Sequence, residues 1–337
     1  KKLLICDTTT RDAHQSLLST RVRTRDIVKG MEGTSEILAD AFSLECWGGA
    51  TFDVAYRFLH ESPWERLDLI REKAPNLLLQ MLLRGANAVG YTNYPDNVIR
   101  EFIKEAARSG IDVFRVFDSL NWIPGMEVAM DEVLKQDKIC QATICYTGDI
   151  LDPKRDKYPL DYYVKLAKEL EHRGAHMLCI KDMSGLLKPY AAQKLVTALK
   201  QEIGIPIQLH THDTSGNQVA ALLLAAEAGV DVVDCAISSM AGMTSQPSLN
   251  AVVAALQNTE RDTRMDLDRL QKLTEYWEDV RKRYESFEGG LKYNTTDIYR
   301  YEIPGGQYTN LKPQVESLGL GDRFVEVKEN YRKVNEM

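Results

Sequence analysis

The sequence predicts a TIM (β/α)8 barrel followed by a helix-rich C-terminal extension, and three observations indicate this class. First, short apolar runs alternate with longer amphipathic segments along most of the chain, which is typical of parallel β/α units. Second, this alternation yields eight strand-like runs with seven helical segments between them, within about 240 residues, the size of a TIM barrel. Third, the turn "DTTTRDAHQ" after the first run has no glycine, whereas the competing class, a doubly wound open sheet, requires a glycine-rich phosphate turn there.

The expected strands are short apolar runs at regular spacing. They cover residues 3–6, 42–47, 76–83, 112–117, 139–146, 176–182, 205–212 and 231–238. Helical patterns lie between them, for example at residues 96–110, 159–174 and 191–204. Each of these three patterns ends at glycine, the residue preferred just after a helix.

A helix-rich tail follows the eighth run. Its two apolar-periodic segments cover residues 247–258 and 267–287. We therefore expect residues 1–245 to form the barrel core and residues 246–337 to form a helical extension packed on it.

Composition narrows the class of protein. The chain has 337 residues, 44% of them hydrophobic, and a mean hydropathy of -0.32, enough for a sizeable core. The net charge of -7 and the interspersed acids and bases argue against a nucleic-acid surface. No apolar run reaches the roughly 18 residues that cross a bilayer. The chain enters its first strand without a targeting segment or an initiator Met, so we expect a fragment of a longer protein.

The cysteines indicate a reducing compartment. The six are Cys6, Cys46, Cys140, Cys145, Cys179 and Cys235. They lie in apolar, strand-like runs, and none forms a CxxC pair. We expect free, buried thiols.

Charged residues gather where the apolar strands end. In chain order they are Arg11, Asp12, Glu45, Arg84, Asp118, Lys181, Asp182, His210, His212 and Asp213. Active sites of TIM barrels lie at the carboxyl ends of the strands. The pattern predicts a polar pocket above an apolar barrel.

The segment "LHTHDTSG" carries the clearest site signal. His210 and His212 stand two apart, so on a strand their side chains share one face. A pair of imidazoles at this end of a strand favours a metal site over a structural role. Asp12 is the nearest further ligand in ring order, because strand 1 abuts strand 8, which abuts strand 7. Such a set suits Zn²⁺, Mn²⁺ or Co²⁺; the alternative for Asp12 is a loop cap or a salt bridge to Arg11.

Lys181, on the strand beside the histidines, admits three interpretations. It forms an ion pair with Asp182 or Asp213, it is a desolvated Schiff-base lysine, or it has reacted with CO₂ to give an anionic carbamate ligand. Spacing alone does not choose among them.

Two further side chains are candidates for contact with a substrate. The guanidinium of Arg84 can bind a substrate carboxylate through two parallel hydrogen bonds, and the alternative is a salt bridge at the rim. Gln15 offers a neutral amide to a carbonyl group, which by itself is weak evidence.

Eight segments together resemble one known family. They are "DTTTRDAHQSLLSTRVRT", "CWGGATFDVAYRFLHESPWERL", "MLLRGANAVGYTNYPDNV", "FRVFDSLN", "CIKDMSG", "LHTHDTSG", "AISSMAGMTSQPSLN" and "IPGGQYTNL". The sequence is similar, from about residue 3 to residue 333, to the carboxyltransferase domain of pyruvate carboxylase. The oxaloacetate decarboxylase α subunit and the transcarboxylase 5S subunit belong to the same family.

The resemblance implies a biotin-dependent carboxyltransferase of the ligase class. The implied reaction moves the carboxyl group of carboxybiotin to pyruvate through an enolpyruvate intermediate and gives oxaloacetate, as in gluconeogenesis and anaplerosis. The implied ligands of a Zn²⁺, Mn²⁺ or Co²⁺ ion are Asp12, carbamylated Lys181, His210 and His212. The implied catalytic residues are Arg11, Gln15, Arg84, Tyr91 and Asp118, of which Gln15 and Arg84 bind pyruvate.

The resemblance also implies partners. These are a biotin carboxyl carrier domain, a biotin carboxylase domain and a second copy of this domain, paired within a homotetramer. The family's proton-shuttle threonine belongs to a segment that would follow "ENYRKVNEM" (329–337). We expect a cytoplasmic bacterial protein, or a mitochondrial matrix protein in a eukaryote, with no nucleic acid or membrane as partner.

Three alternatives remain at this stage. An oxaloacetate decarboxylase α subunit would use much the same site in the reverse direction. A metal-dependent lyase or Claisen synthase shares the Arg-Asp and His-x-His elements but typically completes its metal site without Lys181. A barrel retained only as a scaffold for assembly would show gaps in the ligand set.

Overall fold

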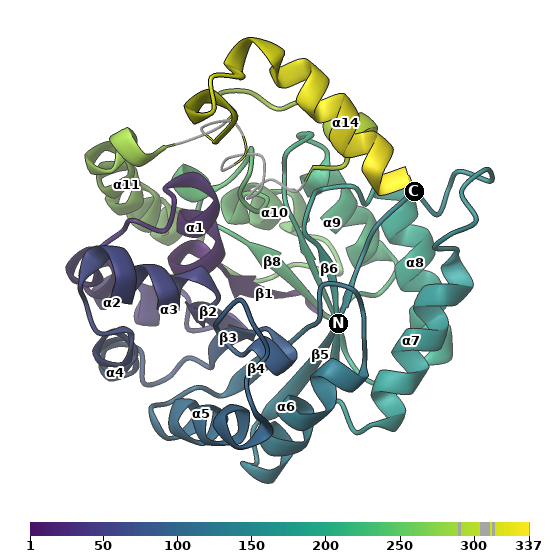
Figure 1. Cartoon of the computed structure of the whole chain (residues 1–337). Coiled ribbons are helices and arrows are strands. Elements are labelled where there is room, and N and C mark those ends of the chain that lie inside the picture. The colour runs from purple at the N-terminus through teal and green to yellow at the C-terminus, as the bar shows by residue number, and fades with distance from the viewer. Residues whose placement is uncertain (289–290, 304–310, 312–313, 337) are drawn as a thin grey trace.

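Eight parallel strands form a closed barrel in the computed structural model, which describes residues 1–288, 291–303, 311 and 314–336. The strands are β1 (Leu4–Asp7), β2 (Ser43–Gly48), β3 (Leu79–Leu83), β4 (Val113–Val116), β5 (Ile139–Cys145), β6 (Met177–Asp182), β7 (Ile207–Thr211) and β8 (Val232–Cys235). They follow one another around the ring in chain order, and β8 pairs with β1 (Figure 1). The predicted TIM barrel is confirmed.

Six of the eight expected strands are shorter than their apolar runs, and those at 76–83, 205–212 and 231–238 lose three or more residues. The run at 76–83 begins as a strand only at Leu79, because the guanidinium of Arg71 takes the carbonyl of Leu77 at 3.0 Å. The run at 231–238 stops at Cys235, because Ala236 turns to an isolated bridge with Ser248.

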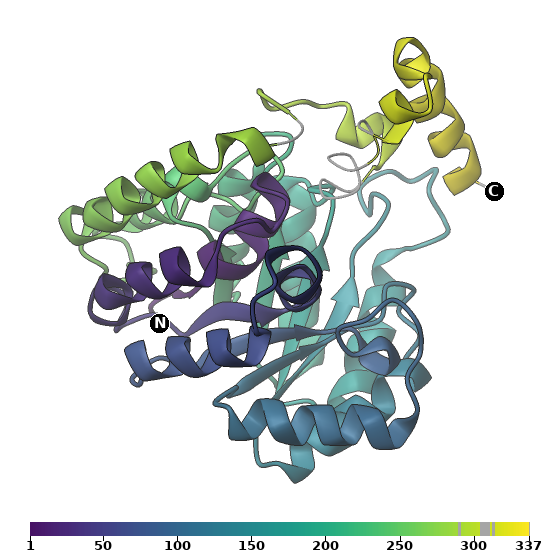
Figure 2. The ribbon, with the colours of Figure 1, turned by 60° about the vertical axis from the view of Figure 1, so that its left-hand side comes forward.

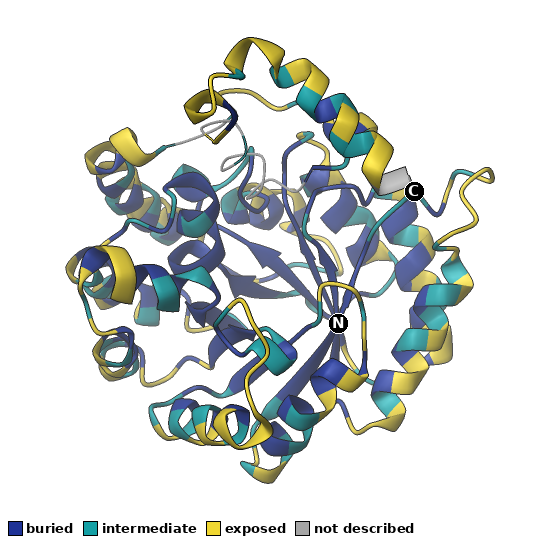
Figure 3. Ribbon diagram, in the orientation of Figure 1, coloured by how far each residue is buried: buried dark blue, intermediate teal, exposed yellow. Residues whose placement is uncertain are grey.

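Helices surround the barrel (Figure 1). The longer ones are α2 (Thr24–Ile37), α4 (Pro63–Lys73), α5 (Asp96–Arg108), α6 (Pro124–Lys135), α7 (Leu160–His172), α8 (Pro189–Glu202), α9 (Gln218–Glu227), α10 (Leu249–Leu256), α11 (Leu267–Arg283) and α14 (Phe324–Glu336). Shorter elements are α1 (His14–Leu17), α3 (Ala50–Val54), α12 (Ile298–Tyr301), the π-helical turns η1 (Thr9–Ala13) and η2 (Ala55–Leu59), and the 3₁₀ turns η3 (Gly85–Asn87), η4 (Ser238–Met240), η5 (Glu285–Phe287) and η6 (Gly321–Arg323). Figure 3 shows buried strands at the centre and exposed outer faces on the helices.

The predicted glycine stops are confirmed after all three helices, because each glycine lies two residues past the last helical residue. Gly110 and Gly174 have φ values of +109° and +87°, the left-handed conformation that glycine adopts without a steric penalty. Gly204 follows α8 at the same distance but has no positive φ. The chain leaves α8 through Ile203 at φ -128° and ψ 151°, an extended conformation that leads directly toward β7.

The tail consists of two parts. Helices α10 and α11 continue the ring, with α10 between α9 and α11 and with α11 packed on α2. Figure 2 shows α14 at the edge of the molecule, apart from α11. The division at residue 245 stays a prediction.

The barrel interior is layered. Cys6, Met177 and Val232 form an apolar plug near the amino ends of the strands. Above the plug, a fully buried polar layer replaces the branched apolar side chains usual in such barrels. Its members are Glu45, Gln80, Arg115, Gln141, Gln208 and Asp234.

Two compositional predictions can be compared with the structure. All six cysteines are free and buried, as expected. Among the described residues, no helix has both the length and the apolar character that a membrane crossing demands.

Candidate metal centre and active site

The carboxyl end of β1 delivers two charged side chains inward. The turn η1 follows β1 and is π-helical, a rare form often found at functional sites. It contains Arg11 and Asp12, which are 1% and 3% exposed. Thr9 connects this turn to the segment that follows β8, because its hydroxyl accepts a hydrogen bond from the backbone N–H of Ile237 at 3.0 Å.

The two histidines meet Asp12 as the sequence predicts. Oδ2 of Asp12 lies 3.0 Å from Nε2 of His210 and 3.3 Å from Nε2 of His212. The two Nε2 atoms are 3.2 Å apart. The three residues are buried, and their ligand atoms form a compact triangle.

This triangle fits one divalent cation. Ligand atoms about 2.1 Å from a shared ion lie about 3.0 Å apart in octahedral geometry and about 3.4 Å apart in tetrahedral geometry. The observed separations of 3.0, 3.2 and 3.3 Å fall within that interval. One carboxylate and two imidazoles suit Zn²⁺, Mn²⁺ or Co²⁺.

Hydrogen bonds behind the ligands aim them at a common point. Nδ1 of His212 donates to the carbonyl of Thr244 at 2.6 Å; since a carbonyl only accepts, the Nε2 lone pair faces Asp12. Nδ1 of His210 lies 2.7 Å from Oδ2 of Asp234, the carboxylate–histidine arrangement common at metal sites.

The two carboxylate oxygens of Asp12 have different partners. Oδ1 lies 3.0 Å from a terminal nitrogen of Arg11, while Oδ2 faces the histidines. The salt bridge and the ligand triangle, which the sequence presented as alternatives, therefore coexist. Burial by itself would raise the pKa of Asp12, but the charge of Arg11 and the contacts with His212 and His210 together outweigh burial and hold that pKa well below its usual range.

Lys181 completes the cluster from β6. Its Nζ lies 3.0 Å from Nε2 of His210 and 4.0 Å from Oδ2 of Asp12. The carboxylates considered as ion-pair partners are engaged elsewhere. Asp182 accepts the backbone N–H groups of residues 185–187 at 2.9 to 3.0 Å, and Asp213 accepts that of Gln218 at 3.0 Å.

Gln15 and Arg11 lie next to each other beside β2. Oε1 of Gln15 accepts the backbone N–H of Ala50 at 3.2 Å. A Cβ atom added to Gly49 would lie 3.4 Å from this oxygen and 3.8 Å from a terminal nitrogen of Arg11. The predicted amide therefore stands next to the metal-ligand cluster.

Arg84 and Tyr91 form a second group. The guanidinium carbon of Arg84 lies 5.1 Å from the centre of the Tyr91 ring. Arg84 also donates to the carbonyl of Val89 at 3.1 Å, and Tyr91 donates to Asp53 at 3.4 Å. Burial lowers the pKa of Arg84, and the charge of Arg11 adds to this effect. Arg84 follows β3 and Arg11 follows β1, so both cations lie at the carboxyl ends of the strands.

The side chain of Asp118 binds backbone groups of its own loop. Its Oδ1 accepts the backbone N–H groups of Leu120 and Trp122 at 2.8 and 3.0 Å. This arrangement closes the turn between β4 and α6. The catalytic role of Asp118 stays a prediction.

Sequence reasoning missed Arg115, Asp234 and Gln246. Gln246 donates to Oδ2 of Asp12 at 3.0 Å. Arg115 and Asp234 are single charges inside the apolar runs "DVFRVF" and "DVVDCAIS", where a buried charge requires a charged partner. One positive and one negative charge in two such apolar runs could have predicted that Arg115 and Asp234 form a buried pair.

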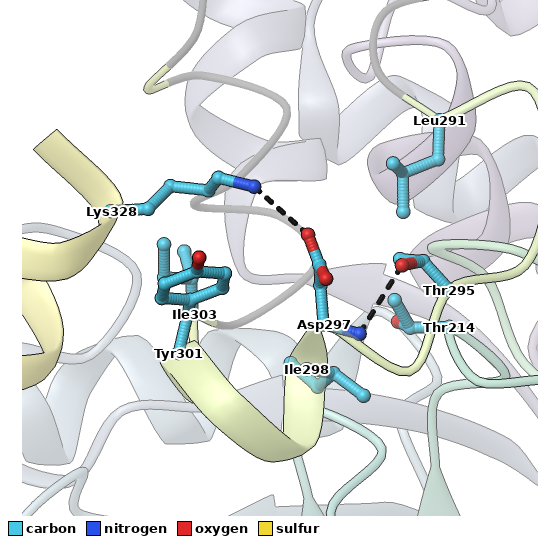
Figure 4. Close-up of a pocket in the computed structure, with 8 residues that line it drawn as sticks. All are labelled: Thr214, Leu291, Thr295, Asp297, Ile298, Tyr301, Ile303 and Lys328. Carbon is cyan, nitrogen blue, oxygen red and sulfur yellow. Dashed lines mark hydrogen bonds and ion pairs between the residues drawn. The ribbon is translucent and has the colours of Figure 1, made fainter. Parts of the chain in front are cut away.

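An apolar cavity lies between α12 and α14 (Figure 4). Its lining is Thr214, Leu291, Thr295, Asp297, Ile298, Tyr301, Ile303 and Lys328, and it includes no predicted site residue. Thr295 donates its backbone N–H to the carbonyl of Thr214 at 2.8 Å, and Asn294 donates to that of Asp213 at 2.7 Å. The C-terminal segment thus braces the loop that follows His212.

Comparison with known proteins agrees with this site. One family model, described as HMGL-like, matches residues 149–276, and another, described as a conserved carboxylase domain, matches residues 298–337. The chain is 58% identical over 337 residues to the pyruvate carboxylase of Bacillus subtilis, with 100% of this chain and 29% of that protein covered. The chain belongs to the pyruvate carboxylase family.

Other members of the pyruvate carboxylase family give the same result. The mitochondrial pyruvate carboxylase of Homo sapiens is 54% identical over 338 residues, covering 99% of this chain and 29% of that protein. The carboxyl transferase domain of Rhizobium etli pyruvate carboxylase superposes with a TM-score of 0.98 at 56% identity, covering 100% of this chain and 57% of that chain. The chain thus spans less than a third of the length of these curated relatives.

Proposed function

We propose that this chain catalyses the carboxyltransferase half-reaction, in which the carboxyl group of carboxybiotin moves to the methyl carbon of pyruvate and gives oxaloacetate. The observation that carries this proposal is the buried triangle of Asp12, His210 and His212 with Lys181 3.0 Å from its edge. Solved carboxyl transferase domains of the Rhizobium etli enzyme are described with pyruvate, and with oxamate and biotin.

The triangle would hold one Zn²⁺, Mn²⁺ or Co²⁺ ion, which supplies Lewis-acid stabilisation of negative charge. The chain's own contribution is to orient the ligands. His210 and His212 keep their Nε2 atoms toward Asp12, because Asp234 and Thr244 hold their Nδ1 atoms.

We further propose that Lys181 supplies a fourth ligand as a carbamate. Burial lowers the pKa of Lys181, which enlarges the fraction present as free amine. The free amine attacks the carbon of CO₂, and loss of a proton leaves the anionic carbamate. This change replaces a cation that would repel a metal by an anion that would bind it.

Pyruvate would lie between the metal-ligand cluster and Arg84. The planar guanidinium of Arg84 matches a carboxylate, and the amide of Gln15 suits the keto oxygen. Loss of a methyl proton places negative charge on that oxygen, where the positive charge of Arg11 stabilises the enolate. Tyr91 and Asp118 would have supporting roles, Tyr91 by stacking on Arg84.

The remaining steps need other parts of a longer protein. The enolate attacks CO₂ released from carboxybiotin, and the biotin nitrogen takes up the methyl proton, with a downstream threonine as the shuttle. A carrier domain brings the biotin and a biotin carboxylase domain charges it. We propose a dimer of this domain within a tetramer, in the bacterial cytoplasm or the mitochondrial matrix.

The test uses the full-length protein that contains this chain. We expect oxaloacetate synthesis from pyruvate and bicarbonate to depend on ATP. Lys181→Ala should abolish this synthesis, while ATP-dependent carboxylation of biotin continues. ATP-independent decarboxylation of oxaloacetate without synthesis would instead indicate the decarboxylase α subunit, and synthesis unaffected by Lys181→Ala would contradict the proposed site.

A further inference from the structure

A network of buried charges lies directly below the metal-ligand cluster. Arg115 on β4 reaches across the barrel to Asp234 on β8, with nitrogen–oxygen distances of 2.6 and 3.2 Å. The same guanidinium lies 2.8 Å from Oε2 of Glu45 on β2. All three side chains are fully buried, so neither carboxylate exchanges these partners for water.

Each carboxylate bound by Arg115 holds one side of the proposed metal site. Asp234 lies 2.7 Å from Nδ1 of His210. Glu45 accepts a hydrogen bond of 2.6 Å from Nε of Arg11, and Arg11 in turn binds Asp12. Two chains of contacts therefore run from one guanidinium to two predicted ligands on opposite sides of the triangle.

Both chains depend on the planar shape of the guanidinium. The two terminal nitrogens of Arg115 face the two carboxylate oxygens of Asp234. This pairing fixes the orientation of the carboxylate, and with it which oxygen of Asp234 faces His210. Nε of Arg115 donates to Gln141 at 2.6 Å, which orients the plane. A lysine ammonium supplies the same charge from a single point and lacks this geometry.

We propose that Arg115 is a positioning residue for the metal site, acting on His210 through Asp234 and by a direct contact of 3.3 Å with Nδ1, and on Asp12 through Glu45 and Arg11. The inference rests on the proposed metal site and adds a residue that touches neither metal nor pyruvate. With Arg115 on β4, the residues that hold the ligands in place include one from the side of the barrel opposite β8.

The test compares Arg115→Lys with wild type in the full-length protein. Zn²⁺ affinity is measured by competition with a chelator, and folding by thermal unfolding. We expect Arg115→Lys to keep the fold and to bind Zn²⁺ about 10- to 100-fold more weakly, the usual effect of losing an outer partner of a ligand. Thr143→Val is the matched control, because this buried hydroxyl has no hydrogen-bond partner among the described residues and its loss should leave Zn²⁺ affinity unchanged.

A second measurement needs no metal. Two-bond ¹H–¹⁵N correlation spectra of the metal-free protein report which ring nitrogen of His210 carries the proton. We expect Nδ1–H in the wild type and in Thr143→Val, and a mixture of tautomers in Arg115→Lys. Unchanged Zn²⁺ affinity together with an unchanged His210 spectrum would overturn the proposal.

The outcomes separate this inference from the proposed function. A wild-type protein that binds no Zn²⁺ contradicts the metal site, while the His210 spectrum still tests the role of Arg115. If Arg115→Lys unfolds, Asp234→Asn breaks the same chain one contact later. That variant should show the same weakened affinity, and full affinity in it would also overturn the proposal.

Discussion

Nζ of Lys181 lies 3.0 Å from Nε2 of His210, across the directly paired strands β6 and β7. The two residues are register partners, so no loop movement is needed to bring them together. An ammonium at this position would repel a cation bound to the imidazole. The contact therefore favours a lysine that changes its charge, which agrees with the proposed carbamate and distinguishes this site from one completed without the lysine.

Removing either partner should empty the proposed metal site. We expect Lys181→Ala and His210→Ala each to lose the metal while the barrel stays folded, because each removes one ligand from a buried cluster. Metal content per chain, measured by plasma mass spectrometry after exhaustive dialysis, checks this. Lys188→Ala, which loses contacts with Asp149 at 2.6 Å and with the ring of Tyr299, is the control and should keep the metal. Full metal in both site variants would refute the ligand set.

Replacing Arg84 should weaken pyruvate binding. We expect Arg84→Ala to cost about 2–4 kcal/mol of binding free energy, as for removal of a buried charge partner, and Arg84→Lys to recover part of it. Titration calorimetry with pyruvate measures both variants. Arg108→Ala removes an exposed arginine on α5 and should leave the affinity for pyruvate unchanged. An affinity for pyruvate in Arg84→Ala equal to that of the wild type would rule out the role assigned to Arg84.

Asp7 should make stability depend on pH. Burial raises the pKa of Asp7 from 3.8 to about 6, so the folded state retains a proton that the unfolded state releases. The neutral carboxyl group contributes its full stabilisation of the folded state at pH values below the pKa that Asp7 has in the unfolded state. This stabilisation is lost as the pH rises through the pKa of the folded state. The loss is about 3 kcal/mol, at about 1.4 kcal/mol per pKa unit.

Asp7→Asn isolates this effect. The amide oxygen can still accept the hydrogen bonds that Asp7 receives from Thr9 at 3.2 and 2.6 Å, yet it cannot ionise. We expect the variant to gain stability over wild type as pH rises from about 4 to about 6, between the unfolded and folded pKa values of Asp7, and this gain is measured by denaturant unfolding. The exposed Asp68→Asn should show a constant difference, and a constant difference in Asp7→Asn would disprove the explanation.

Two glycines in α2 should respond in opposite directions to alanine. A Cβ at Gly30 would lie 2.9 Å from a Tyr276 ring carbon and 3.1 Å from a Trp277 ring carbon, so Gly30→Ala should cost about 1–3 kcal/mol by overpacking. A Cβ at Gly33 meets Leu273 at 3.6 Å, so Gly33→Ala should gain about 0.5–1 kcal/mol of helix stability. Thermal unfolding distinguishes the two, and equal shifts would mean that α11 does not pack on α2 as described.

Much of the fold could be predicted because its signals are local. Each strand is a short apolar run, and eight such runs separated by amphipathic helices leave few architectures open. The strand ends were less certain, because they depend on which side chains take the backbone carbonyls. Arg71 at the carbonyl of Leu77 is one such case, and only the folded chain brings the two together.

The sequence by itself determined the barrel and the residue types at its mouth. His210 and His212 share a face because side chains alternate along a strand, and Asp12 is their neighbour in ring order once β8 meets β1. Only the tertiary structure decided that Asp12 gives one oxygen to Arg11 and the other to the histidines. The tertiary structure also decided that Arg115 meets Asp234. Their strands lie on opposite sides of the barrel, and closure of the sheet, which no local pattern encodes, sets the distance between them.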